Sequence, residues 1–354
     1  MRTWKAVAPT DLLPSSVQSF PAAGRLADRP RHDRDRVTAT EITLEIRPQA
    51  RFDVVDVRRR VLESYGRTLE SFPQVLYCSF HTTAGYLDQR TVCQLNMGRN
   101  GVTPYLRGFQ NLFPEGAGYR HDELHLRREL SKEQRRVEPR NGDSHLAFIS
   151  AGLRNCVTYR HRPGESVFFI DLDGVNAGSP RHRITTILGF TSEEVVARDR
   201  LVIPIATRSV ECVNLKDPSL GLFEQLEELI ARHEVTRGRI KLRLAAGERQ
   251  AALTINEYET LLMHYDLPEV IRNPFRFMGD RRRPAADTRA VRTRGTIAAR
   301  FLRLQRSVSL LVSSGGTDGS GHLVQGRFQS PILFQWGPAD GSRRDIEVTL
   351  TRLR

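Results

Sequence analysis

The chain has 354 residues, of which 54 are basic and 41 acidic, giving a formal net charge of +13. This length is enough for two ordinary domains that each bury a core of their own. The longest apolar runs, such as Val167-Phe168-Phe169-Ile170, have the length of a strand and are too short to cross a bilayer. No continuous apolar stretch follows the start at Met1-Arg2, so we expect neither a membrane segment nor a secretory signal.

The positive charge suggests a nucleic-acid partner, but the distribution of the charge argues against one. Only four of the 54 basic residues are lysines and the others are arginines, a skew that a GC-rich coding sequence produces. The arginines are scattered with few aromatics around them, whereas a nucleic-acid groove combines a basic face with stacking aromatics. The four cysteines show no C-x-x-C spacing, which favours free thiols in a reducing compartment. We therefore expect a cytoplasmic protein that binds no nucleic acid.

The first half of the chain has the pattern of an α+β unit. Residues 1–36 have neither helical nor strand periodicity, which predicts a poorly ordered basic tail. Residues 37–46 alternate like a half-buried strand, and Asp53 is expected to cap a helix of amphipathic period. A strand at 75–80 runs directly into His81. Three more strands are predicted at residues 155–159, 166–172 and 183–190.

The second half repeats this order. Residues 201–215 are extended, and Ser219 is expected to cap a helix. Strands are then predicted at residues 239–244, 306–312, 322–329 and 344–350. Because the same order occurs twice, the pattern indicates duplication of a whole domain and not a solenoid. We predict two tandem copies of an α+β domain, at residues 37–194 and 199–354, joined near residues 194–199.

Three histidines stand at turn-like junctions in the first copy. They and two arginines belong to the segments His81-Thr82-Thr83-Ala84, Tyr119-Arg120-His121, Asn141 with His145-Leu146, and Pro180-Arg181-His182-Arg183. These residue types make a poor core, but imidazole and guanidinium groups suit a polar pocket for an anionic or metal-bound ligand.

With these four segments, the first copy resembles the YjbQ-type family of secondary thiamine-phosphate synthases. That family shows H-T-T-A followed by Asn-Glu, then Y-x-H, N-x-x-x-H-L, G-T-W-Q and G-P-R-x-R. The first copy departs from the pattern in two places. The expected Asn-Glu falls near Gln89-Arg90, and the expected Trp-Gln falls within residues 169–172, where neither occurs.

The second copy carries what the first lacks. Its Asn256-Glu257 resembles the Asn-Glu element, Gly326-Arg327-Phe328-Gln329 resembles G-T-W-Q with Phe for Trp, and residues 340–344 resemble the D-G-P-R-x-R end. Its counterpart of H-T-T is Glu248-Arg249-Gln250, and the position of His145 corresponds to about Ala298. The second copy is therefore degenerate in its histidines.

The resemblance implies a YjbQ-like α/β sandwich that assembles into oligomers. The complementary losses suggest one pocket shared between the copies. In this hypothesis His81, His121 and His145 come from the first copy, and Asn256, Glu257 and Gln329 from the second. The alternative is that the second copy is a structural remnant that covers a sheet edge.

The site residues have separate expected roles. The three histidines either transfer protons or hold a divalent metal, zinc or magnesium. Arg181 and Arg183 alternate along a strand and so share one face, which suits a phosphate group. The remaining predicted substrate contacts are Thr82, Thr83, Tyr119, Asn141, Asn256, Glu257 and Gln329. Asp171-Leu172-Asp173-Gly174 resembles a cation loop, but Asp-Gly turns between strands are common without metal.

The resemblance implies a transferase that joins a pyrimidine diphosphate to a thiazole phosphate and releases pyrophosphate. We expect a phosphorylated small molecule as substrate and a homo-oligomer as the assembly. Two other functions remain open from the sequence. One is a catalytically inactive YjbQ-like binding or assembly module, and the other is a metal-dependent hydrolase that uses the same histidines.

Overall fold

The computed structural model of the chain describes residues 39–95, 99–205, 210–278, 302–314, 319–337 and 340–354. The predicted tail at 1–36 and the counterpart of His145 near Ala298 lie outside these residues. In chain order, the elements of the first half are β1 Thr40–Ile46, β2 Asp53–Asp56, α1 Val57–Tyr65, β3 Gln74–Ser79, β4 Ala84–Gly85, α2 Gln89–Gln94, α3 Arg99–Leu112, α4 Lys132–Val137, α5 Gly142–Ser150, β5 Cys156–Arg160, β6 Phe168–Asp171, β7 Val175–Asn176, β8 Ser179–Pro180 and β9 Arg183–Phe190.

The elements of the second half follow after two residues. They are β10 Glu193–Pro204, β11 Glu211–Asn214, η1 Pro218–Leu220, α6 Leu222–Arg232, β12 Arg237–Leu244, β13 Ala251–Asn256, η2 Leu262–Asp266, α7 Leu267–Arg272, β14 Ser307–Ser313, β15 His322–Val324, β16 Ser330–Gln335, η3 Asp340–Ser342 and β17 Arg343–Leu353. No helix in the described ranges is long and apolar enough to span a membrane.

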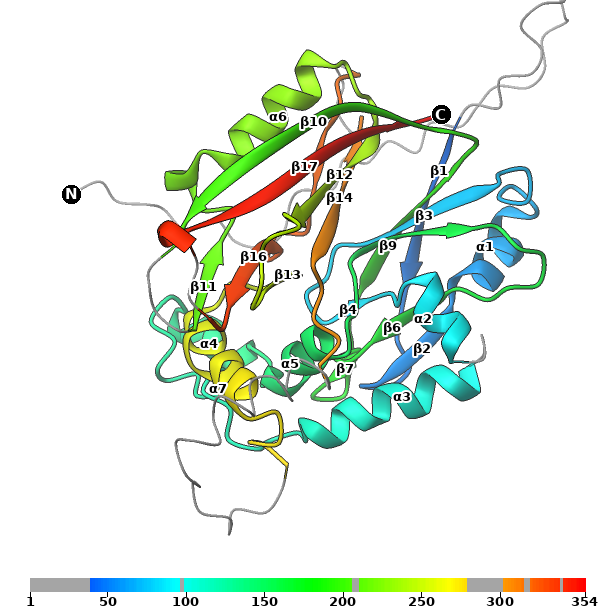
Figure 1. Cartoon of the computed structure of the whole chain (residues 1–354). Coiled ribbons are helices and arrows are strands. Elements are labelled where there is room, and N and C mark those ends of the chain that lie inside the picture. The colour runs from blue at the N-terminus through cyan, green and yellow to red at the C-terminus, as the bar shows by residue number, and fades with distance from the viewer. Residues whose placement is uncertain (1–38, 96–98, 206–209, 279–301, 315–318, 338–339) are drawn as a thin grey trace, which may run out of the picture. The chain divides into compact units, whose positions relative to one another are not determined.

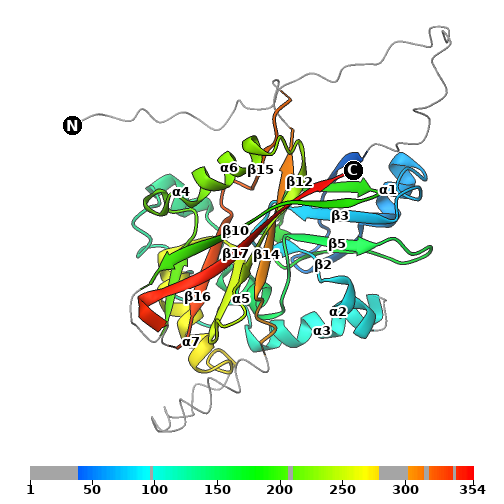
Figure 2. The same ribbon diagram turned by 45° about the horizontal axis from the view of Figure 1, so that its top comes forward.

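The two halves share one strand topology. The large sheet has the order β1-β9-β3-β5 in the first half and β10-β17-β12-β14-β15 in the second. The small sheet has the order β2-β6-β4 in the first half and β11-β16-β13 in the second. Each strand of these two sheets in the first half thus has a counterpart in the second half, which adds β15 at one edge, and the first half also contains the two-stranded sheet β7–β8. Figure 1 labels the second-half strands β10, β17, β12 and β14, and Figure 2 labels β15. The chain is two tandem copies of one α+β fold.

The pairing register of the strands shows which single residues of the two copies are equivalent. Ala84 pairs with Asp171 in the first copy, and Ala251 pairs with Gln335 in the second. Ala84 and Ala251 are therefore equivalent, and counting back three residues makes His81 equivalent to Glu248. This agrees with the correspondence that the motifs predict.

Apolar side chains pack the two large sheets in different ways. The outer face of the first sheet, with Leu76, Cys78 and Phe190, packs against Leu311 and Leu353 of the second copy. This contact joins the copies. In the second sheet, the long antiparallel pair β10–β17 lies beside β12, as Figure 2 shows. The first sheet is therefore covered on both faces.

The outer face of the second sheet is more polar. Lys241 and Arg243 of β12 are exposed on it, and Arg243 pairs with Glu347 on the neighbouring strand β17. Alternation with the buried Ile240 and Leu242 turns these charged side chains away from the core of the second copy.

Two predicted helix caps were wrong. Asp53 begins strand β2, because the β-branched pair Val54-Val55 pairs with β6, and it is Asp56 whose side chain accepts from Arg59 N at the start of α1. Ser219 lies inside the short η1, whose cap is Asp217.

Two further boundaries differ from the prediction. Residues 194–199, expected as the junction, belong to strand β10, and only Thr191 and Ser192 separate it from β9. The sequence pattern ended a strand at Gln329, whereas β16 begins at Ser330 and is the central strand of the small sheet. All six residues of β16 are buried, so its sequence lacks the alternation that marks a half-exposed strand.

Gly326 provides a test of how the copies dock. A Cβ atom at this position would lie 1.9 Å from the carbonyl oxygen of Phe80 in the first copy. We expect Gly326→Ala to lower the free energy of unfolding by about 1–3 kcal/mol, the usual cost of overpacking. Gly247→Ala is the matched control, because no atom lies within 4 Å of the Cβ there. Urea unfolding of both variants measures the difference, and equal stabilities would contradict the close docking at Gly326.

Candidate functional site

A buried polar cluster lies where the two copies meet. Its first-copy part comes from the turns before α4, from helix α5 with its N-cap residue, and from the loop after β6. Its second-copy part comes from the end of β13 and the segment after it. We call this set the inter-copy cluster, and its members are His121, Arg127, Asn141, His145, Asp173, Asn256, Glu257 and Glu259. It includes two of the three predicted histidines.

The hydrogen bonds of His121 define its charge. Its Nδ1 lies 3.0 Å from Glu259 Oε2, and its Nε2 lies 3.1 Å from Asn141 Oδ1. The amide of Asn141 is oriented by its Nδ2, which donates to Asp173 Oδ2 at 2.7 Å. Both ring nitrogens of His121 therefore face acceptors, and only an imidazolium can donate to both. His121 is a buried cation.

His145 has a different arrangement. Its Nδ1 lies 2.7 Å from Asn256 Oδ1, and the Nδ2 of the same amide donates to Thr82 O at 2.8 Å. Nδ1 must therefore carry a proton, which leaves Nε2 as the site of the lone pair when the ring is neutral. That Nε2 lies 3.6 Å from Glu257 Oε2, which is beyond a hydrogen bond.

Electrostatics shift the pKa values of the two rings in opposite directions. Burial lowers the pKa of His121, but the hydrogen bond to Glu259 and the charge of Glu257 outweigh burial and raise it above 6.5. Burial and the neighbouring charge of His121 hold the pKa of His145 well below 6.5. The ring centroids are 5.0 Å apart. A cationic and a neutral imidazole thus lie in contact, as an acid and a base would.

Arg127 connects this pair to the surface. Its guanidinium is 3% exposed and donates to Glu129, Glu138 and Glu257 at 2.7, 2.9 and 3.2 Å. Burial raises the pKa of Glu257, whose side chain is 20% exposed. Glu257 therefore bridges from the buried His145 to solvent.

His81 lies beside the cluster without joining the imidazole pair. Its Nε2 accepts from Ile184 N at 2.8 Å, and its carbonyl oxygen accepts from Asn155 and Gln329. Burial, with the charge of Arg183 as the second cause, lowers the pKa of His81 to about 3. His81 is a neutral side chain that fixes the edge of the first copy.

Glu248 occupies the equivalent place in the second copy. Its Oε1 accepts from Asp345 N at 2.8 Å, as His81 accepts from Ile184 N. Its Oε2 also accepts from the buried Arg344 at 2.7 Å. The carboxylate of Glu248 thus neutralises the guanidinium of Arg344, which a neutral histidine at this position would not do. The polar groups at this position of the second copy are therefore satisfied within that copy.

Arg181 lies in the connection between β8 and β9 and Arg183 is the first residue of β9, so the two arginines do not alternate along one strand as predicted, and neither is a free cation. Arg183 is buried and donates from Nε and Nη2 to the two oxygens of Asp171 at 2.7 and 2.8 Å. Arg181 Nη2 donates to Asp173 Oδ2 at 2.5 Å. His182 points the other way and pairs with Glu45. The two aspartates neutralise the expected phosphate clamp.

The remaining predicted contacts have structural partners. Tyr119 is buried on Phe277, and its hydroxyl donates to Pro114 O at 2.9 Å. Thr83 Oγ1 accepts from Arg183, and Thr82 contributes its carbonyl to Asn256. Packing thus explains Tyr119 without a substrate.

Gln329 contacts the first copy, where its Nε2 donates to Ser79 O and His81 O at 3.0 Å. The motif comparison had placed the first-copy counterpart of Gln329 within residues 169–172, but the counterpart lies elsewhere. Gln329 stands six residues before Gln335, and six residues before the equivalent Asp171 is Glu165. The prediction was wrong because it matched the motif by order along the sequence, whereas the strand register makes Asp171 equivalent to Gln335 and so places the counterpart before β6.

The histidines do not fit a divalent metal. Both nitrogens of His121, Nδ1 of His145 and Nε2 of His81 are engaged in hydrogen bonds within the protein. Ligating imidazoles need a free lone pair directed at one common point. Within the described parts of the chain, no group of three or more His, Cys, Asp or Glu side chains has a metal-binding arrangement.

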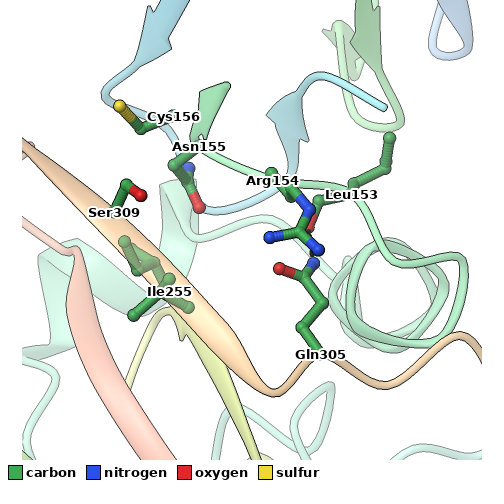
Figure 3. Close-up of a pocket in the computed structure, with 8 residues that line it drawn as sticks. Leu153, Arg154, Asn155, Cys156, Ile255, Gln305 and Ser309 are labelled. Carbon is green, nitrogen blue, oxygen red and sulfur yellow. Dashed lines mark hydrogen bonds between the residues drawn. The ribbon is translucent and has the colours of Figure 1, made fainter. Parts of the chain in front are cut away.

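Figure 3 shows a small cavity between the copies, lined by Leu153, Arg154, Asn155 and Cys156 of the first copy and by Ile255, Gln305, Val308 and Ser309 of the second. Its volume of about 10 Å³ suits a single water molecule. A wider groove of about 210 Å³ lies between α1 and residues 161–166, and none of the predicted site residues line it.

Sequence reasoning missed Arg127, Asp173 and Glu259. Arg127 is one arginine in an arginine-rich chain, and Glu259 lies outside the family motifs. Asp173 stands in the Asp-Leu-Asp-Gly run, which was the one signal that pointed to it.

The pKa of His81 gives a prediction about pH. Because its folded pKa of about 3 lies below the unfolded value of 6.5, the unfolded chain binds a proton that the folded chain does not. The stability that neutral His81 provides is complete above pH 6.5 and is lost as the pH falls toward 3. In His81→Gln, Oε1 can still accept from Ile184 N–H, but the side chain does not titrate.

We therefore expect the wild type to lose stability relative to His81→Gln by up to about 1.4 kcal/mol per pH unit below pH 6. Urea unfolding between pH 8 and about pH 4 measures this difference. Parallel stability curves for the two proteins would contradict the lowered pKa.

No family model and no curated protein matches the sequence. Among solved structures, the chain is similar to a YbjQ-like protein of unknown function from Sulfolobus solfataricus P2, with 21% identity and a TM-score of 0.31, over 46% of this chain and 99% of that one. It is also similar to a hypothetical protein from Aeropyrum pernix K1, with 16% identity and a TM-score of 0.29, over 44% of this chain and 98% of that one. An uncharacterized conserved protein of the YjbQ family from Clostridium acetobutylicum shows 14% identity and a TM-score of 0.28, over 44% of this chain and 99% of that one. The chain resembles the YjbQ-type family, as two tandem copies of which the second has Glu248 in place of His81.

Proposed function

We propose that the chain is an enzyme that transfers protons at the inter-copy cluster during a reaction of a small polar substrate. The observation that carries this proposal is the contact between a cationic His121 and a neutral His145. Environments that push two neighbouring pKa values apart are typical of acid–base pairs at active sites.

The cluster supports a division of roles. His145 Nε2 carries the free lone pair and faces Glu257 across 3.6 Å. If both groups were unprotonated, two acceptors would face each other, so this gap favours a proton on one of them. Glu257 exchanges that proton with substrate or solvent, because it is the partly exposed member of the pair. His121 holds a positive charge that keeps His145 neutral.

The specific reaction is proposed from the resemblance. Thiamine-phosphate-synthase-like chemistry breaks the bond between the pyrimidine methylene carbon and the diphosphate, forms a bond from that carbon to the thiazole nitrogen, and releases pyrophosphate. A proton donor assists the departure of pyrophosphate, and the cluster can supply one. The neutralised arginines give no separate support for a phosphate clamp.

The second candidate is a catalytically inactive assembly module. Burial favours it, since His121 and His145 are 0% and 1% exposed. In that case the hydrogen bonds of the cluster only hold the two copies together, and substitutions in the cluster lower stability alone.

Protonation states can be measured without knowing the substrate. In ¹⁵N-histidine-labelled protein, we expect long-range ¹H–¹⁵N spectra to show His121 doubly protonated above pH 6.5, and His145 neutral with its proton on Nδ1 below pH 6.5. Glu259→Gln removes the carboxylate beside His121 and is expected to lower the pKa of that ring. A His145 that titrates near 6.5 would refute the proposed acid–base pair.

Turnover tests the enzyme against the assembly module. His145→Asn keeps a donor for Asn256 and removes Nε2. We expect it to slow pyrophosphate release from the pyrimidine diphosphate and thiazole phosphate about 100- to 10,000-fold, with little change in the urea midpoint. His322→Gln is the control, because His322 is exposed and pairs with Glu227 away from the cluster. Loss of stability with no wild-type turnover would favour the assembly module.

A further inference from the structure

Asp173 and Arg181 form an ion pair that is incomplete on both sides. Asp173 is fully buried, and its Oδ2 accepts from Arg181 Nη2 and from Asn141 Nδ2 at 2.5 and 2.7 Å. Its Oδ1 is buried and has no hydrogen-bond partner. Arg181 Nε is likewise buried without a partner, although the side chain is 29% exposed as a whole.

An unpaired buried carboxylate oxygen is costly, because it has lost its hydration without gaining a protein donor. The same holds for the N–H of Arg181. A single ion pair thus presents one unsatisfied acceptor and one unsatisfied donor, at the partly exposed end of the inter-copy cluster. Asn141 connects this pair directly to His121, since it donates to Asp173 and accepts from the imidazolium.

The charge balance decides which ligand suits the pair. Arg181 and Arg183 carry two positive charges, and Asp171 and Asp173 carry two negative charges in direct contact with them. A phosphate dianion therefore meets no net positive charge here, and it would bring its oxygens close to the free Oδ1. A neutral group with a hydrogen-bond donor next to an acceptor satisfies both Asp173 Oδ1 and Arg181 Nε instead.

We propose that Asp173 and Arg181 bind a neutral substrate group in which an N–H or O–H donor stands beside an acceptor, such as a primary carboxamide. The carbonyl oxygen accepts from Arg181 Nε, and the amide N–H donates to Asp173 Oδ1. This inference rests on the proposed function, because it assigns the binding of substrate to the site where His121 and His145 act. It replaces the phosphate role that the sequence suggested for Arg181.

Three probes built on one benzoyl group test the proposal: benzamide has the donor and the acceptor, the bulkier N,N-dimethylbenzamide has the acceptor alone, and benzoate is an anion of nearly the same size as benzamide. Binding is followed on the ¹H–¹⁵N signal of Arg181 Nε, with Arg183 Nε, already bonded to Asp171, as the internal reference. We expect benzamide to shift the Arg181 signal saturably and to bind at least about tenfold more tightly than the other two probes. Inorganic phosphate is expected to leave the signal unchanged.

Asp173→Asn should reverse the preference. The amide keeps the shape and an acceptor for Asn141, but it removes the negative charge, so we expect benzoate to bind this variant more tightly than benzamide. Asp345→Asn is the control, because Asp345 pairs with Arg200 at the surface of the second copy. Melting temperatures of both variants confirm that they are folded.

Equal binding of the three probes, no saturable binding of benzamide, or saturable binding of phosphate to the wild type would each overturn the proposal. The result is independent of turnover. If His145→Asn is as active as wild type while benzamide still binds, the acid–base proposal fails and the carboxamide site remains. If the imidazole pair is present and benzamide does not bind, the reverse holds.

Discussion

The contact of His121 with Glu259 is the interaction on which the site depends. It places a buried positive charge at the boundary between the copies and supplies the carboxylate that stabilises this charge. A buried charge without such a partner would neutralise instead. With the charge fixed, His145 is held neutral, and Asn141 and Asn256 are left with one possible amide orientation each. Each polar group of the cluster thus constrains the next through a hydrogen bond.

The partners in this network are far apart in sequence, and they come from both copies. Asp266 and Glu259 of the second copy bind the backbone N–H and the ring of His121, and Asn256 binds His145. A single copy cannot assemble the site, because it lacks half of the acceptors. The apolar contact between Leu76 and Phe190 of the first copy and Leu311 and Leu353 of the second stabilises this arrangement from the other side of the first sheet.

Much of the fold could be predicted from the sequence, because period and order are local signals. The alternation of β1 and of β12 and the amphipathic α6 all lie where the pattern put them, and the repeated order indicated the duplication. The buried strand β16 was missed, since full burial removes alternation. Motif spacing brought His121, His145 and Asn256 to attention, but not Glu259 or Arg127. Glu259 joins the cluster through a ring 138 positions away, and Arg127 joins it through Glu257, 130 positions away, and no local pattern marks partners at such distances.

The duplication also explains how each copy could lose part of a shared site without a cost in hydrogen bonds. In the first copy, Gln89 stands where the second has Asn256, and its amide donates to Glu165, the counterpart of Gln329. In the second copy, Glu248 replaces His81 and pairs with Arg344. Both replacements satisfy polar groups within their own copy. A substitution that closes one of two equivalent sites leaves the other complete only when the two copies are different stretches of one chain, as they are here. In an assembly of identical single-copy chains, the same substitution would enter every site at once.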